Sequence, residues 1–261
     1  MKESKVLNVV FSVLTALLVL TGSVAVPLLC RPFYYAHIES YNLTGYGVTV
    51  EQIKTAYNQM MDFCLGLRPD FAVGELVFSQ SGMEHFVDVK KLFLLDLWVL
   101  GACLAALVIL LVVCRKKKLH SAPLVGRGPG FWGAVGLGAS FLMVGALAAL
   151  DFDRAFVIFH SIFFPGKTNW VFDWRVEPII LLLPQDFFMN CAILILALVL
   201  VWCAALIAAD IWAEKKRREI EEKRRKAEGI QKVFASAGNP CAGCASFRPD
   251  GSGGCSGCTP Q

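Results

Sequence analysis

Long apolar stretches alternate with polar and charged stretches along this chain. Four apolar stretches lie at about residues 6–30, 92–114, 131–150 and 187–212, and their central parts carry no charged side chain. An α-helix needs about 20 apolar residues to cross the hydrocarbon core of a bilayer. The pattern therefore predicts an all-α fold, a four-helix transmembrane bundle. Residues 31–91 and 151–186 would form a small extracytoplasmic cap, mainly helical and rich in aromatic residues.

The cap segments carry helical patterns of their own. Residues 51–67 repeat apolar side chains at helical spacing, which indicates an amphipathic helix. Residues 84–91 predict the start of a helix that continues into the second span. Residues 153–164 predict a helix that ends before Pro165 and Gly166, and residues 175–182 predict a shorter one.

Composition supports a membrane protein. The chain is 56% hydrophobic and 18% charged, whereas soluble domains are about half apolar and about a quarter charged. Lys and Arg gather in the loop that opens at Arg115 and in the tail from Lys215, and cytoplasmic segments favour such residues. We therefore expect a multi-pass plasma-membrane protein with both termini cytoplasmic. On this reading the net charge of +4 is no sign of nucleic-acid binding.

Length and composition also indicate the roles of the first apolar stretch and of one loop. The first apolar stretch, residues 6–30, is longer than a typical signal-peptide core, so we expect an uncleaved anchor. The loop at residues 120–130 is rich in Gly and Pro and is expected to be a connector.

Two histidines are the candidate reactive groups. His85 and His160 each lie close to the cap end of a predicted span, and imidazoles exchange protons near neutral pH. Asp88 would share a helical face with His85 and could orient its ring. The sequence contains neither a GxSxG nor an HExxH motif, so a nucleophile should come from the substrate. Lys90 and Arg154 are candidates for stabilising an oxyanion.

Two sequence motifs carry a resemblance to a known family. The segment HFVDVK precedes one span, and FHSIFFPGKTNWVFDW followed by LLPQDFF precedes another. Together with the four-span plan, they resemble the lipoprotein intramolecular transacylase family over roughly residues 6–213. Phe86 stands where the family is expected to have Met, and it preserves bulk and apolarity.

The resemblance implies a reaction and its residues. A transacylase of this family would move the sn-2 acyl chain of a diacylglyceryl lipoprotein to the amine of its own N-terminal cysteine, with no cofactor. Its expected partners are diacylglyceryl-modified bacterial lipoproteins and membrane lipid, and its active site should face outside. His85 and His160 would be the catalytic pair. The expected supporting residues are Asp88, Lys90, Asp153 and Arg154, and the expected substrate-binding residues are Phe86, Phe163, Phe164 and Trp170.

The end of the chain has a different composition. Residues 215–239 are dense in both signs of charge and predict a cytoplasmic helix or linker after a membrane domain at residues 1–214. In the Cys-rich tail, residues 240–261, Cys241, Cys244, Cys255 and Cys258 form two CxxC pairs that could bind structural zinc.

Two alternatives stay open at this stage. One is a metal-dependent membrane hydrolase with His85, Asp88 and His160 as ligands. The other is a non-enzymatic membrane scaffold with a zinc-binding tail.

Overall fold

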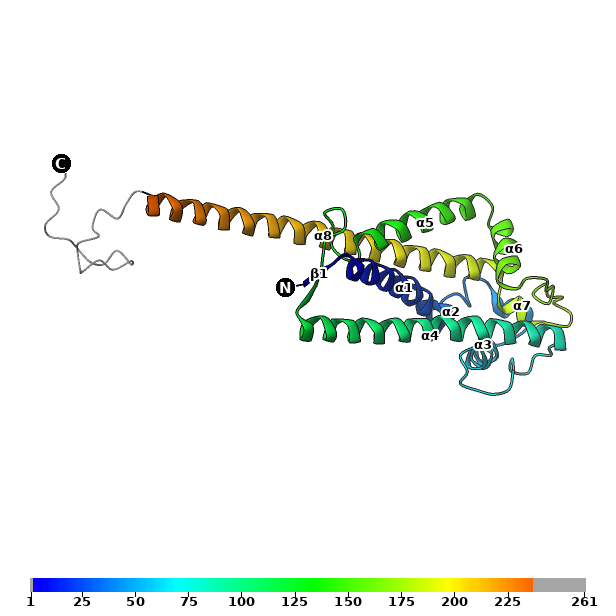
Figure 1. Cartoon of the computed structure of the whole chain (residues 1–261). Helices are drawn as coiled ribbons and strands as arrows, with labels where there is room; N and C mark the ends of the chain where they lie inside the picture. Colours follow the sequence, from blue (N-terminus) through cyan, green and yellow to red (C-terminus); the bar gives the residue numbers. More distant parts are fainter. Residues whose placement is uncertain (1, 237–261) are drawn as a thin grey trace, which may run out of the picture. The chain divides into compact units, whose positions relative to one another are not determined.

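The computed structural model describes residues 2–236 of the 261-residue chain. It divides into two compact units, Met1–Asp210 and Ile211–Gln261. The elements follow in the order β1 (Lys2–Ser4), α1 (Lys5–Leu29), α2 (Arg31–Tyr35), the 3₁₀ helix η1 (Leu43–Tyr46), α3 (Val50–Cys64), α4 (Gln80–Lys117), β2 (Leu119–Ser121), α5 (Phe131–Leu150), α6 (Phe152–Phe163), α7 (Ile179–Leu182) and α8 (Gln185–Ser236) (Figure 1).

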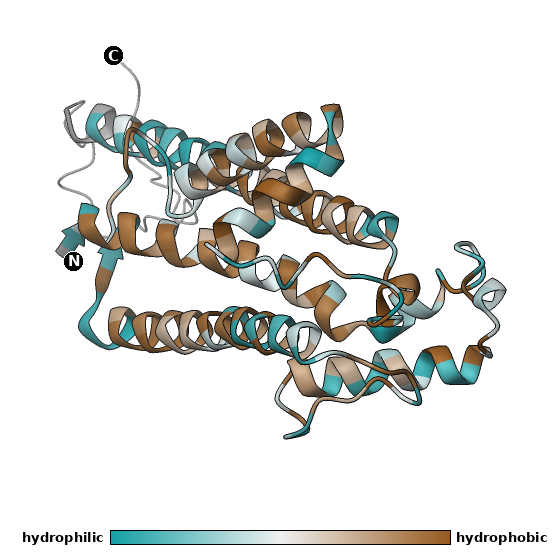
Figure 2. Cartoon of the chain, turned by 90° about the vertical axis from the view of Figure 1, so that its right-hand side faces the viewer, coloured by the Kyte–Doolittle hydropathy of each residue, from teal (hydrophilic) through white to brown (hydrophobic). Residues whose placement is uncertain are grey.

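Four helices confirm the predicted spans. Among residues 2–236, only α1, α4, α5 and α8 are long and apolar enough to cross a membrane, and their apolar positions show brown in Figure 2. Large side chains such as Trp98 and Val108 on α4 and Leu147 on α5 are exposed, as expected of lipid-facing positions. The described chain is therefore a predominantly helical membrane protein.

Helix α4 is much longer than its span. Its 38 residues extend about 57 Å at the standard rise, roughly twice the thickness of the hydrocarbon core. The uncharged part of the span covers residues 97–114, and the first turns, which carry His85, Asp88 and Lys90, form an extension before the span. Ser79 caps this extension by accepting the N–H of Gly82 at 3.0 Å.

Small residues on α5 allow close packing with its neighbours. A Cβ added at Gly133 would lie 2.5 Å from the carbonyl oxygen of Ser12 on α1, and one added at Gly145 would lie 2.7 Å from Leu196 on α8. Side chains cannot occupy that space without moving a backbone or a packed leucine. The glycines therefore set the approach of α5 to both helices.

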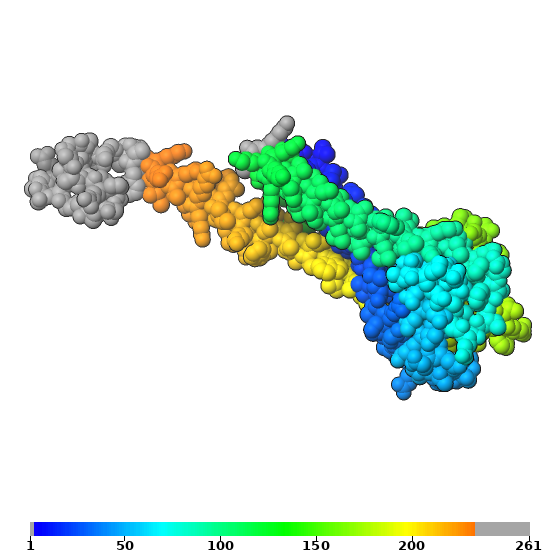
Figure 3. Space-filling view, turned by 90° about the horizontal axis from the view of Figure 1, so that it is seen from below, coloured from blue at the N-terminus to red at the C-terminus, as the bar shows by residue number. Residues whose placement is uncertain are grey.

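Residues 31–91 and 151–186 gather at one end of the first unit, and Figure 3 shows the blue-to-cyan part of this cap. Helix α3 begins with a capping box between Thr49 and Gln52 and buries the apolar face that its sequence predicted. The ring of Tyr57 on α3 stacks on Tyr34 of α2 at 3.7 Å, and the Tyr34 hydroxyl donates to the carbonyl of Leu182 at 2.8 Å. These contacts join α2, α3 and α7 in one core.

The other end of the first unit is closed by contacts that the sequence did not indicate. Strands β1 and β2 pair in parallel. The buried amide of Asn8 donates to the carbonyls of Ala122 and Arg127 at 3.0 and 3.2 Å, and the N–H of Gly128 donates to Asp210 at 2.8 Å. The predicted connector is thus bonded to both α1 and α8.

Two sequence expectations about secondary structure need correction. The short helix expected at residues 175–182 is only Ile179–Leu182, because Pro178 disfavours helical backbone at the residue before it. The segment at 120–130 is more than a connector, since its beginning belongs to β2.

In the second unit, α8 continues through Ser236. Successive turns carry ion pairs at i,i+4 spacing, including Lys226 with Glu222 at 2.7 Å and Arg224 with Glu228 at 2.8 Å. Pairs of this kind each add a few tenths of a kcal/mol to an exposed helix. The boundary predicted at residue 239 and the four tail cysteines, Cys241, Cys244, Cys255 and Cys258, lie outside the described residues.

Candidate active site

The two candidate histidines lie together in the cap. His85, on the extension of α4, and His160, on α6, have ring centroids 6.0 Å apart. Their exposed fractions are only 6% and 7%. They come from helices separated by 75 positions in sequence, so their meeting depends on the tertiary fold.

His160 is held by its own helix. Its Nδ1 lies 2.8 Å from the carbonyl oxygen of Phe156. A carbonyl can only accept, so Nδ1 carries the proton and Nε2 has the free lone pair. Trp170 stacks on the imidazole with centroids 4.6 Å apart. Burial lowers the pKa of His160, and the hydrogen bond to Phe156 opposes part of that effect.

His85 lies among aromatic rings. The centroids of Phe164, Phe172 and Phe86 are 4.9, 5.5 and 5.9 Å from its own. Its Nδ1 is buried, with no hydrogen-bond partner among the described residues. Burial, followed by the charge of a protonated His160, lowers the pKa of His85 to about 4, while Asp88 pulls it upward. Both imidazoles are therefore neutral at pH 7.

Asp88 faces two lysines instead of the His85 ring it was expected to orient. Its carboxylate accepts from Lys91 Nζ at 3.0 Å and from Lys167 Nζ. Burial alone would raise the pKa of Asp88, but the hydrogen bonds from Lys167 and Lys91 bring it below its ordinary value. Asp88 is therefore a carboxylate that joins α4 to the segment after α6.

The other expected supporting residues lie away from the pair. The ammonium of Lys90 lies 4.2 Å from the ring centroid of Phe63. Asp153 accepts a hydrogen bond from Gln185, and the N–H of Arg154 donates to Asp151 at 2.9 Å. Asp153 and Arg154 occupy the first turn of α6, about 9–10 Å along the helix from His160.

The expected substrate-binding rings divide into two groups. Phe164 and Trp170 contact the histidines directly, and Phe86 stacks on Phe71 and Phe172. Phe163 contacts Phe159 at 4.6 Å and is exposed.

Sequence reasoning missed Phe172, Lys167 and Glu177. Phe172 lies in an aromatic-rich stretch whose rings, taken singly, suit a membrane interface, but it packs against His85. Glu177 is buried and accepts from the Ser79 hydroxyl and from the Asp173 N–H. A Cβ at Gly82 would lie 2.8 Å from Glu177. The only available signal was that all three belong to, or closely follow, the second family-like motif.

The described residues hold no group of three or more His, Cys, Asp and Glu side chains that could bind a metal. In particular, His85, Asp88 and His160 do not converge as ligands, since Asp88 is engaged by two ammonium groups.

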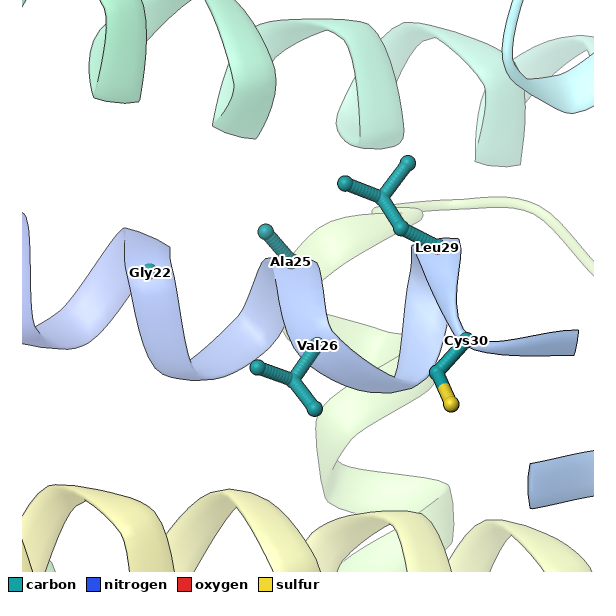
Figure 4. Close-up of a pocket in the computed structure, with 5 residues that line it drawn as sticks. All are labelled: Gly22, Ala25, Val26, Leu29 and Cys30. Carbon is teal, nitrogen blue, oxygen red and sulfur yellow. The ribbon is translucent and has the colours of Figure 1, made fainter. Parts of the chain in front are cut away.

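An apolar hollow of about 440 Å³ lies beside α1 (Figure 4). Its lining residues are Gly22, Ala25, Val26, Leu29 and Cys30.

A row of aromatic rings leads from α2, the helix after this hollow, to His160. It runs from Phe33 on α2 through Phe187 and Phe188 on α8 to Phe156 and His160 on α6, with successive centroids 6.0, 5.9, 5.8 and 4.2 Å apart. The row therefore leads from α2, which directly follows the hollow in sequence, to His160.

Comparison with known proteins gives consistent results. Residues 9–188 match the family described as lipoprotein intramolecular transacylase Lit. The in meso structure of the membrane-integral Lit from Bacillus cereus is 26% identical, with a TM-score of 0.70, covering 82% of this chain and 97% of that one.

Two variants of the same Bacillus cereus protein are also similar. The structure with an H85R mutation covers 82% of this chain and 93% of its own, and the one with an H85A mutation covers 82% and 94%. Each is 25% identical with a TM-score of 0.66. The comparison with curated proteins found no match.

Proposed function

This chain belongs to the lipoprotein intramolecular transacylase family, and from that premise we propose that it moves the sn-2 acyl chain of a diacylglyceryl lipoprotein to the amine of the lipoprotein's own N-terminal cysteine. The product is an N-acyl, lyso-glyceryl lipoprotein. The observation that carries the proposal is the buried pair of imidazoles, His85 and His160, 6.0 Å apart in an aromatic site.

The reaction needs proton transfer more than a protein nucleophile. An α-amino group has a pKa near 8, so its ammonium must lose a proton before the nitrogen attacks the ester carbonyl. A C–N bond forms and the C–O bond to glycerol breaks. The nitrogen loses a second proton as it becomes an amide, and the glyceryl oxygen takes up one proton, so one proton leaves the site overall. Because amine and ester belong to one molecule, good alignment alone contributes roughly 7–11 kcal/mol.

His160 is the better placed base. Its Nδ1–H donates to the Phe156 carbonyl, and this bond stabilises the imidazolium that forms when Nε2 accepts a proton. Burial lowers the pKa of His85 to about 4, so an imidazolium at His85 would not persist at neutral pH. We assign His85 the role of a proton relay. One of its nitrogens accepts a proton while the other donates one to the glyceryl oxygen.

The hollow beside α1 supports a place for an acyl chain. It lies on a spanning helix and is lined mainly by apolar side chains. The row of rings that leads to His160 begins at Phe33, three residues after Cys30 at the end of the hollow. An acyl chain of a lipoprotein that is anchored in one leaflet extends through about 15 Å of hydrocarbon. We propose that one chain of the substrate occupies this hollow while its ester lies at the histidines.

The orientation proposed is with both termini in the cytoplasm and the cap outside. It is supported by the basic last turn of α4, which contains Arg115, Lys116 and Lys117. A reporter enzyme that works only in the cytoplasm should be active when it is fused after Gln261. An inactive fusion would show that the C-terminus lies outside.

The sequence also supports a separate property of the tail. The paired CxxC motifs at Cys241, Cys244, Cys255 and Cys258 favour a structural zinc site on the reducing side of the membrane. In this proposal the zinc takes no part in acyl transfer.

Mass spectrometry of lipoprotein N-termini tests the activity. Bacterial cells whose lipoproteins are diacylated should gain the N-acyl lyso form when this chain is expressed. Cells expressing His85→Ala or His160→Ala at matched membrane levels should not. Unchanged lipoprotein ends in cells expressing the native chain would reject the proposed function.

A further inference from the structure

The segment after α6 folds over both histidines. We call residues 164–172 the aromatic loop. Phe164 and Phe172 lie against His85, and Trp170 lies against His160. One loop thus supplies rings to each member of the pair.

Lys167 is the residue through which this loop is held. Its ammonium donates to Asp88 on α4. Its N–H donates to the carbonyl of Phe164 at 3.1 Å, and its carbonyl accepts the indole N–H of Trp170 at 3.0 Å. Lys167 therefore links α4, the ring against His85 and the ring against His160.

We propose that the Asp88–Lys167 ion pair is a positioning device that fixes the aromatic loop over His85 and His160. Asp88 lies three residues after His85, on the same helical face, so the pair anchors the loop about one turn from the imidazole. The inference rests on the proposed function for its kinetic consequence, but the anchoring itself can be measured without activity.

Burial separates this pair from ordinary surface ion pairs. The Asp88 side chain is only 11% exposed, whereas Lys167 is 47% exposed. Exposed pairs contribute little, but a carboxylate that is nearly buried is costly to leave without its partner. The loop is therefore held, at the Asp88 end, by a carboxylate that is largely shielded from water.

Lys91 provides a matched control. It donates to the other oxygen of Asp88 and is 70% exposed, so Lys91→Met and Lys167→Met each remove one ammonium from the same carboxylate. Lys91 lies on α4, as Asp88 does, and cannot tie the loop to that helix. A difference in hydrogen exchange between the two variants therefore reports the loop and not the loss of one ammonium from Asp88.

Charge around His85 supplies a second readout. The titratable groups that act on its pKa are His160 on α6, Asp88 on α4 and Lys167 in the loop. Lys167 lowers the pKa of His85 and Asp88 raises it. Removing Lys167 should therefore raise the pKa of His85, and Asp88→Asn should lower it, which NMR titration of the His85 imidazole can measure.

The experiment compares full-length variants in lipid nanodiscs with a diacylglyceryl lipopeptide that has a free N-terminal cysteine amine. Lys167→Met should slow acyl transfer about 10- to 100-fold, the range for a displacement of about 1 Å, and should speed hydrogen exchange in residues 165–174. Lys91→Met should do neither, and Lys167→Arg should restore most of both. The pKa of His85 should move in opposite directions in Lys167→Met and Asp88→Asn.

Two outcomes would overturn the inference. One is equal effects of Lys91→Met and Lys167→Met on rate and exchange, and the other is unchanged exchange in Lys167→Met. If the native chain forms no N-acyl product while exchange behaves as expected, the proposed function fails and the positioning role stands.

Discussion

The indole of Trp170 stacks on the imidazole of His160, with ring centroids 4.6 Å apart and an interplanar angle of 28°. Aromatic contacts of this kind contribute about 0.5–1.5 kcal/mol beyond burial. The contact fixes the ring that we assign as the base, so Trp170 acts on the reaction through His160.

Replacing that indole should therefore slow acyl transfer. Trp170→Ala is expected to reduce the rate about 10-fold or more, since about 1.4 kcal/mol corresponds to one factor of ten. Trp174→Ala is the control, because Trp174 is exposed and contacts Arg175. Equal losses in the two variants, measured with the lipopeptide substrate, would contradict a role specific to Trp170.

His37 should be dispensable for chemistry. Its Nδ1 donates to the carbonyl of Phe33 at 2.7 Å, and its Nε2 accepts from Asn190 at 3.2 Å, so both nitrogens are engaged. His37→Gln should retain the rate within a few-fold, while His85→Gln and His160→Gln lose about 100- to 10,000-fold, as expected for acid–base groups. The measurement is the rate of acyl transfer normalised to folded protein. A large loss in His37→Gln would show that His37 takes part in the reaction.

Acid should destabilise the cap through His85. Burial lowers the pKa of His85 from 6.5 to about 4, so below pH 6.5 the unfolded chain binds a proton that the folded chain excludes. Stability is thus fully present above pH 6.5 and is lost as the pH falls toward 4. The thermal unfolding midpoint in detergent should fall over this window, and less steeply in His85→Phe. Equal slopes would show that His85 is not the group responsible.

Filling the hollow beside α1 should alter acyl-chain preference. A Cβ at Gly22 meets nothing within 4 Å, so Gly22→Leu can fold and extends into the space. We expect shorter chains to be favoured over longer ones by about 10-fold, in the range for methylene discrimination in apolar pockets. Gly101→Leu on α4, where a Cβ also meets nothing within 4 Å, is the control. Identical chain-length profiles of the N-acyl products would remove the hollow from the substrate site.

The Cys-rich tail should be separable from acyl transfer. A chain ending at residue 239 is expected to keep the rate of the native protein, because the described site lies wholly within the first 188 residues. Metal analysis should find about one zinc per native chain, the content of one Cys₄ site, and none in the truncated one. Loss of activity on truncation would connect the tail with the membrane unit.

The spans and most cap helices could be predicted because their signals are local. Apolar length predicts α1, α4, α5 and α8, and the spacing of Ile53, Met60 and Cys64 predicts the buried face of α3. The partnership of His85 with His160 came from the family-like motifs combined with the four-span plan. No pattern in either segment alone indicates a distance of 6.0 Å between the rings.

The contacts that the sequence did not predict are those between distant segments. Spacing places Asp88 on the face of His85 but says nothing about Lys167, which lies 79 positions later. Phe172 belongs to an aromatic-rich stretch in which each ring, taken singly, suits a membrane interface equally well. Only the fold around the end of α6 distinguishes Phe172, packed on His85, from Trp174, which is exposed.

The continuity of α4 ties the position of His85 to the surrounding lipid. His85 lies 12 residues before Leu97, where the uncharged part of the span begins, or about 18 Å along one unbroken helix. A span that tilts by about 10° to match a thinner bilayer would carry His85 sideways by about 3 Å. His160 lies on α6, which is not a spanning helix, so it need not follow. Bilayer thickness is thereby transmitted to the geometry of the two imidazoles.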